Sequence, residues 1–218
     1  NRDIPLNGLK SFAIFTKNTY TISFNTNGGS AIANISSLYG EEITKPASPT
    51  KEGYTFKGWF TSQGQTNDDW GNEYIVFSTM PSNSFTLYAK WEINNYALSF
   101  NSNGGNEIDP LNKAFGSEVI LPSLTRTGYT FKGWATSLDG EVTYLAGAKY
   151  TITSSSQVLH AVWEIKSLTI SFEENGGSEV LDITQEYNSS ITQPENPSRV
   201  GYTFDGWFTD KTFKNEYV

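Results

Sequence analysis

A seven-residue phrase that occurs three times most constrains how this chain can fold. It reads Gly-Tyr-Thr-Phe-Lys/Asp-Gly-Trp and occupies residues 53–59, 128–134 and 201–207. A second marker, Asn-Gly-Gly, recurs with nearly the same spacing at residues 27–29, 103–105 and 175–177. Self-similarity at a fixed period indicates that one structural unit is copied in tandem. The 218 residues are therefore predicted to form a row of small modules.

Each module is predicted to be β-rich. It opens with alternating apolar and polar residues, which indicate a half-buried strand, at residues 20–25, 96–101 and 168–173. The Asn-Gly pair that follows tolerates the positive φ angles of tight hairpin turns. A Pro-containing stretch comes next, and it indicates an edge segment or a loop because proline donates no ladder hydrogen bond.

The second half of each module carries two further strands. The Gly-to-Trp phrase, here called the Gly-Trp segment, is predicted to be a strand in which Gly58 forms a bulge that returns Trp59 to the core. A closing strand with the same alternation is expected at residues 85–91 and 158–163. Residues 78–82 are predicted to hold one short helix or turn, although the chain has no long apolar stripe of helical period.

The repeat phase predicts four segments. Residues 1–19 are the tail, or last strand, of an upstream repeat, because residues 12–15 align without gaps on residues 88–91. Repeat 1 spans 20–95, repeat 2 spans 96–167, and repeat 3 spans 168–218 and is truncated before its last strand. Only four residues separate Trp91 from Tyr96, so neighbouring modules are expected to touch through stiff or semi-stiff joints.

These out-of-phase ends predict self-association. An unpaired strand edge invites pairing with another chain. The N-terminal strand of one molecule is therefore hypothesised to complete repeat 3 of another, or to pair at an exposed edge, in a head-to-tail arrangement.

The three motifs together resemble the Listeria–Bacteroides repeat, also called the B-repeat, of internalin-like bacterial surface proteins. The resemblance covers the whole chain and includes the closing Leu-Tyr-Ala-Lys-Trp at residues 87–91. It implies an α+β, β-rich fold of tandem β-grasp (ubiquitin- or SUMO-like) repeats. It also implies secretion to the bacterial cell surface, a parent protein often anchored in a Gram-positive cell wall, and a spacer or adhesion-associated role without catalytic residues.

Composition excludes several classes of protein. The net charge is −8 and no basic cluster follows a phosphate backbone, so no nucleic-acid partner is expected. No apolar run approaches the ~18 residues of a membrane span, so no membrane insertion is expected of this segment. The absence of cysteine excludes a small disulfide scaffold and fits either a reducing cytosol or the surface of bacteria that export cysteine-poor proteins. Aromatic residues, 15% of the chain, are expected to supply the core instead.

Four features are candidate sites, and each has a structural explanation. The Gly-Trp segments are predicted to be core rather than a carbohydrate-stacking platform. The single His160 occupies a position held by Tyr88 in repeat 1, which favours a packing or outer-face residue over a catalytic base. Residues 67–69, Asn-Asp-Asp, lack the spacing of a calcium loop. Lys57 and Lys132 are possible isopeptide donors, but Asp205 in repeat 3 indicates a solvent-facing position.

No catalytic, cofactor-binding or metal-binding residue is therefore predicted, and no cofactor. The sequence predicts a non-enzymatic stalk or spacer of a bacterial surface protein that supports adhesion or host interaction. The alternative is a module that binds a host protein or glycan directly.

Overall fold

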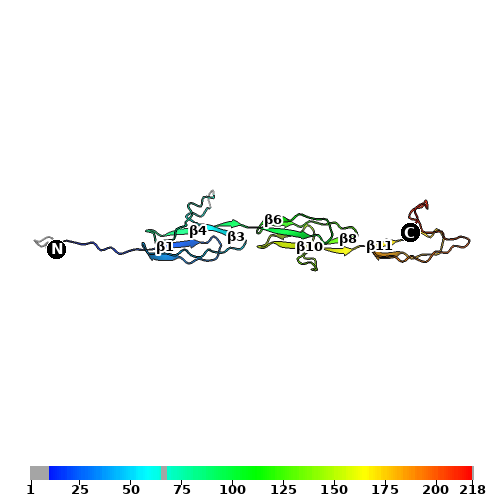
Figure 1. The fold of residues 1–218 in the computed structure, drawn as a ribbon, viewed down its shortest axis with the longest axis horizontal. Helices are drawn as coiled ribbons and strands as arrows, with labels where there is room; N and C mark the ends of the chain where they lie inside the picture. The colour runs from blue at the N-terminus through cyan, green and yellow to red at the C-terminus, as the bar shows by residue number, and fades with distance from the viewer. Residues whose placement is uncertain (1–9, 65–67, 218) are drawn as a thin grey trace. The chain divides into compact units, whose positions relative to one another are not determined.

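The computed structural model describes residues 10–64 and 68–217, and this part of the chain contains β-strands and no helix (Figure 1). The predicted α+β, β-grasp fold is therefore wrong, and the described chain is all-β. A β-grasp unit needs a helix packed across one face of its sheet. Here the connections between strands lack an apolar stripe of helical period, and loop side chains cover the sheet instead.

Repeat 1 contains one four-stranded sheet in the order β2-β1-β4-β3. Its strands are β1 (Thr19–Asn25), β2 (Ile35–Leu38), β3 (Tyr54–Phe60) and β4 (Phe85–Ile93). The opening strand β1 and the closing strand β4 pair in parallel at the centre, and the other pairs are antiparallel. The closing strand therefore lies between the opening strand and the Gly-Trp segment.

Repeat 2 contains a second four-stranded sheet, in the order β6-β5-β10-β8. Its strands are β5 (Asn95–Asn101), β6 (Leu111–Ala114), β8 (Tyr129–Ala135) and β10 (Gln157–Ile165). Again the opening strand β5 pairs in parallel with the closing strand β10, which pairs antiparallel with β8. Two short strands, β7 (Glu118–Ile120) and β9 (Lys149–Thr151), form a separate two-stranded sheet.

Repeat 3 has less regular structure. Its described strands are β11 (Ser167–Ile170) and β12 (Ile183–Glu186), which pair antiparallel. Its Gly-Trp segment, residues 201–207, is not in a strand. In repeats 1 and 2 the same segment forms its ladder with the closing strand, and no such strand occurs among the described residues of repeat 3.

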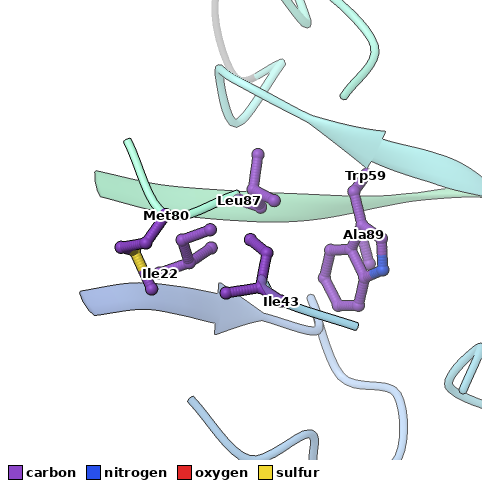
Figure 2. Close-up of a cluster of buried hydrophobic side chains, with 6 residues drawn as sticks. All are labelled: Ile22, Ile43, Trp59, Met80, Leu87 and Ala89. Carbon is purple, nitrogen blue, oxygen red and sulfur yellow. The ribbon is translucent and has the colours of Figure 1, made fainter. Parts of the chain in front are cut away.

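The core of repeat 1 combines strand and loop residues (Figure 2). Ile22 on β1, and Leu87 and Ala89 on β4, face Trp59 at the end of β3, and loop residues Ile43 and Met80 cover them. The six residues shown are Ile22, Ile43, Trp59, Met80, Leu87 and Ala89, and none is more than 9% exposed. The segment predicted as a short helix or turn at residues 78–82 is not helical. Its backbone pairs with residues 40 and 41 through Met80 and so holds that side chain in the core.

The predicted glycine bulge is confirmed. The register between β3 and β4 shifts between Phe56 and Gly58, whose φ of 133° is disfavoured for a residue with a Cβ. Gly133 repeats this with a φ of 145°. The extra residue turns Trp59 and Trp134 inward, and they are 1% and 0% exposed.

The Asn-Gly-Gly turns have the predicted positive φ, at 47° for Asn27 and 84° for Gly28. They also tie the opening strand to the closing strand: Asn27 Nδ2 donates to Ala89 O at 2.8 Å, and Asn103 Nδ2 donates to Ala161 O at 2.6 Å. Gly29 lies under the Trp91 ring, where an added Cβ would be 2.5 Å from a ring carbon. The close approach of the Trp91 ring therefore requires glycine at the third position of the Asn-Gly-Gly marker.

We expect Gly133→Ala to destabilise repeat 2 more than Gly147→Ala does. Gly147 has a φ of 78°, which costs about 1–2 kcal/mol for alanine. Gly133 has a φ of 145°, a region that only glycine adopts readily, at a cost of about 1–3 kcal/mol for other residues. At Gly133 the new Cβ would also lie 2.5 Å from the Tyr144 carbonyl oxygen, whereas at Gly147 no atom lies within 4 Å. Overpacking adds about 1–3 kcal/mol. Urea denaturation measures both variants, and equal losses would show that the close approach contributes nothing.

Candidate functional site at the joints between repeats

The joint between repeats 1 and 2 is built on the backbone of Asn94. Its N–H donates to the carbonyl of Gly53, the first residue of the Gly-Trp segment, at 2.9 Å. Its carbonyl accepts from the N–H of Phe115, in the turn after β6, at 2.9 Å. One residue between β4 and β5 thus binds both the repeat before it and the repeat after it.

An aromatic ring fills this joint. The Phe115 ring lies against Gly53 so closely that an added Cβ would be 2.2 Å from a ring carbon. It meets the Tyr54 ring edge-on, with centroids 6.2 Å apart, a geometry that aromatic pairs favour. Ser154 Oγ donates to Glu52 Oε1 at 2.7 Å beside it. Residues 112–118 and 151–156 of repeat 2 accordingly belong to one compact unit with repeat 1.

The joint between repeats 2 and 3 uses the same contacts. Lys166 N–H donates to Gly128 O at 2.9 Å, and Tyr187 N–H donates to Lys166 O at 2.7 Å. An added Cβ at Gly128 would lie 2.0 Å from the Tyr187 ring, and the Tyr129 and Tyr187 centroids are 6.5 Å apart. The recurrence of one contact set at two joints shows that it belongs to the repeat.

A cation lies over the tyrosine of each Gly-Trp segment. The Arg126 guanidinium is 3.7 Å from the Tyr129 ring centroid and donates to Asn103 O at 2.9 Å. The equivalent pairs are Lys51 with Tyr54 at 4.4 Å and Arg199 with Tyr202 at 4.1 Å. The cation–π contact and the bond to the Asn-Gly-Gly turn hold the ring that the next repeat's aromatic residue meets.

Two halves of this joint surface have no counterpart within the described residues. Tyr39, the equivalent of Phe115, is 51% exposed. Gly201, the equivalent of Gly53, has no atom within 4 Å of an added Cβ, and Tyr202 is 68% exposed. The comparison shows that neighbouring repeats cover these surfaces wherever two repeats meet.

Sequence reasoning predicted close joints but did not identify the seated ring. The available signal was an aromatic residue followed by Gly or Asn, at residues 39–40, 115–116 and 187–188. Gly40, Gly116 and Asn188 have φ of 76°, 75° and 63°, so each completes a tight turn that presents the ring.

Most candidate site residues have structural roles. Trp59 and Trp134 are buried, so the core prediction is confirmed for them. His160 lies half-buried on β10 in register with Asn101 and Ala135, and its buried Nδ1 has no hydrogen-bond partner among the described residues.

Within the acidic segment at 67–69, Asn67 lies outside the described residues. Asp68 Oδ1 accepts from Trp70 Nε1 at 2.5 Å, and Asp69 Oδ1 accepts from Gly71 N–H at 2.9 Å. Both carboxylates are thus engaged by their own turn. Among the residues that the structure describes, no three metal-ligating side chains gather in one place.

Lys57 and Lys132 pair with acidic residues of the closing strand. Lys57 Nζ lies 3.0 Å from Glu92 Oε2, and Lys132 Nζ lies 3.0 Å from Glu164 Oε2. Both lysines are nearly half exposed. Each lysine therefore lies beside a carboxylate at the protein surface.

We expect Gly128→Ala to release Tyr187 from the joint, because the new methyl group would occupy the place of the ring. Gly201→Ala is the matched control, since Gly201 has the same φ of 78° with open space around it. The NMR chemical shifts of the Tyr187 ring should move toward those of an exposed tyrosine in the first variant only. Unchanged shifts in Gly128→Ala would contradict the role of the glycine.

None of the described segments forms a helix with the length and hydropathy needed to cross a bilayer. The solved structure of domains 3–4 of the Streptococcal High Identity Repeats in Tandem from a cell surface protein covers 67% of this chain, at 17% identity and a TM-score of 0.21. That score carries no argument about this fold.

Two proteins found by sequence comparison have higher sequence identity to this chain than that solved structure has. A protein of Evansella cellulosilytica named "Putative Gly-rich membrane protein" is 38% identical over 92% of this chain, and Internalin H of Listeria monocytogenes is 32% identical over 62%. The chain spans 22% and 23% of these relatives' own lengths. The Listeria–Bacteroides repeat domain matches residues 20–90, 96–162 and 169–218. The chain therefore belongs to the Listeria–Bacteroides repeat family and consists of tandem copies of its domain.

Proposed function

We propose that this chain is a non-enzymatic stalk segment of a bacterial cell-surface protein. The observation that carries the proposal is the joint: the same backbone bonds and the same seated ring occur at Gly53 and at Gly128. The relatives named as a membrane protein and as an internalin support a surface location. The parent protein is proposed to be anchored in the cell wall and to present an adhesive domain.

The joints give this stalk its mechanism. A flexible linker lets neighbouring modules fold back, so its reach grows only as the square root of its length. Here the connecting residue, Asn94, is hydrogen-bonded to the repeats on both sides, and the Phe115 ring packs into the contact. Each added repeat then adds length instead of mobility, and a domain carried beyond the array is held away from the cell.

The direct binding of a host protein or glycan is the alternative. A binding surface built from the repeated aromatic residues would need them exposed in every copy. Trp59 and Trp134 are in the core, which favours the stalk. Ile75 and Leu145 are exposed at equivalent positions, because each follows a tyrosine whose N–H donates to the carbonyl of the core tryptophan. These two residues are the repeated apolar positions that direct binding would use.

Spin labels at Ser48→Cys and Ser123→Cys test the stiffness of the first joint. These positions are equivalent and exposed in repeats 1 and 2, and the chain has no other cysteine. We expect a narrow distance distribution by pulsed electron resonance, and a broad one when Phe115→Ser removes the seated ring.

The matched control for this measurement is Tyr39→Ser, which removes the equivalent ring at a position that is 51% exposed and has no seat among the described residues. It should leave the distribution narrow, and circular dichroism should show that both variants remain folded. A broad distance distribution in the chain that carries only the two spin labels would contradict the stalk proposal.

Binding assays test the alternative. We expect the folded chain to show no saturable binding to host cells, glycans or matrix proteins. Saturable binding would favour the alternative. An exposed residue such as Tyr202 is then the appropriate site for mutation, because Trp134→Ala would damage the core.

A further inference from the structure

We propose that repeats 1 and 2 bear tension along the array through the parallel pair that the opening and closing strands form in each. The pair and the side-chain hydrogen bonds at its two ends are called the tension clamp here. The clamp comprises residues 21–27 and 84–91 in repeat 1, and residues 97–103 and 156–163 in repeat 2. It is a property of a single repeat, so it holds whether the joints between repeats are stiff or flexible.

Parallel pairing decides how a pull acts on a repeat. In repeat 1 the pair runs from Ile22 with Phe85 to Asn25 with Tyr88, so β1 and β4 point in the same direction. The chain therefore enters the pair at the start of β1 and leaves it at the end of β4, at opposite ends of the sheet. A pull on the neighbours of the repeat slides the two strands past each other lengthwise. The bonds of the ladder then carry the load together, whereas a pull across one end of the pair would open them one after another.

Side-chain hydrogen bonds lengthen this ladder at both ends. Before the first ladder pair, the Thr21 N–H donates to Ser84 Oγ at 2.9 Å. After the last pair, Asn27 Nδ2 donates to Ala89 O at 2.8 Å. The strands are thus bonded to each other over a longer stretch than the ladder alone provides, and more bonds must break before the strands can slide.

Repeat 2 has the same arrangement. Its ladder joins Leu98–Asn101 to Gln157–His160. The Ala97 N–H donates to Ser156 Oγ at 3.3 Å before the ladder, and Asn103 Nδ2 donates to Ala161 O at 2.6 Å after it. The recurrence of both end bonds indicates that the clamp belongs to the repeat.

The tryptophan of each closing strand adds a further bond to the clamp. Trp91 Nε1 donates to Thr26 O in repeat 1, and Trp163 Nε1 donates to Ser102 O in repeat 2, both at 2.9 Å. Each indole therefore ties the closing strand to the turn that follows the opening strand, in the same direction as the ladder.

Burial protects the clamp on its core face. Ile22 on β1, and Leu87 and Ala89 on β4, are 0% exposed and meet in the core (Figure 2). In repeat 2, Leu98 and Leu159 are 0% and 1% exposed. Water cannot reach the ladder from this face, so it replaces a strained backbone hydrogen bond less readily than it would on an exposed strand pair.

The connections between repeats pass the load directly from one opening or closing strand to the next. Only Asn94 lies between β4 and β5, and only Lys166 lies between β10 and β11. Load therefore crosses repeats 1 and 2 through the two central strands of each sheet. The edge strands β2, β3, β6 and β8 lie outside this path.

Single-molecule force spectroscopy with two directions of pull tests the clamp in the full chain. The chain has no cysteine, so handles can be attached at introduced ones. Lys17→Cys with Glu92→Cys pulls β1 and β4 lengthwise. Ala31→Cys with Glu92→Cys pulls across the end of the pair, because residue 31 follows the turn after β1. All three positions are exposed, and the two variants share one attachment point.

We expect the lengthwise pull to need a roughly two- to fourfold higher unfolding force, because the four ladder pairs share the load in that direction only. Gains in contour length of about 25 nm for the lengthwise pull and about 20 nm for the other identify the unfolding of repeat 1. Equal forces in the two directions, or a lower force lengthwise, would overturn the clamp. Both pulls act on repeat 1 alone, so such a result would leave the stiffness of the joints, and with it the stalk proposal, untouched.

Two serines that bind Thr21 provide a matched pair of variants. Ser84→Ala removes the acceptor of the Thr21 N–H in the clamp, whereas Ser36→Ala removes the hydroxyl that bonds Thr21 Oγ1 from the edge strand β2. Both serines are exposed, and each substitution removes one hydrogen bond. At a constant lengthwise force, Ser84→Ala should unfold about fivefold faster than the chain with serine, and Ser36→Ala at an unchanged rate.

Urea denaturation of the same two variants is the control. It should show similar losses of equilibrium stability in both, so that the difference in unfolding rate under force reports the load and not the stability. Equal unfolding rates of Ser84→Ala and Ser36→Ala under lengthwise force would overturn the assignment of the load to the pair of β1 and β4.

Discussion

The parallel pairing of the closing strand with the opening strand organises each complete repeat. β4 and β10 lie inside their sheets, so they join the opening strand on one side to the Gly-Trp segment on the other. Leu87 and Ala89 of the closing strand are part of the buried core. The Asn27 side chain donates a hydrogen bond to the Ala89 carbonyl and so joins the turn after the opening strand to the closing strand. In repeat 3, where no closing strand is described, the Gly-Trp segment forms no ladder and its aromatic residues line a groove.

Glycine allows two close approaches that a chain without disulfides and with small cores relies on. Gly29 and Gly105 lie under the indoles of the closing strands, and Gly53 and Gly128 lie under the rings of the next repeat. In each case backbone meets an aromatic face without an intervening Cβ, so contact area is gained where side chains would separate the elements. The same device packs a repeat internally and packs it against its neighbour.

The strands whose alternation is strong were predictable from the sequence. The opening and closing strands, the glycine bulge and the buried tryptophans all follow from period-2 patterns and from the meaning of Gly in a strand. The short edge strands β2 and β6 were missed because four residues carry too little pattern. A helix was expected both from the family resemblance and at residues 78–82, and it is absent from the described residues, because Met80 and Ile43 reach the core from extended loops. The aromatic ring at each joint was missed because Phe115 and Tyr187 follow short strands as isolated aromatic residues, and only the three-dimensional contact distinguishes them from any exposed ring.

The position of the closing strand in the chain has a consequence for biosynthesis. The strand at the centre of the sheet is the last of its repeat to be made, and Ile22 pairs with Phe85 across most of the module. Such long-range pairing makes folding slow relative to local helix formation. A growing chain can therefore complete a repeat only when its final residues have emerged, and each repeat must wait in an open state until then. Synthesis and export from the N-terminus would finish the modules one at a time, and an unfinished module would always be the one nearest the ribosome or the export pore.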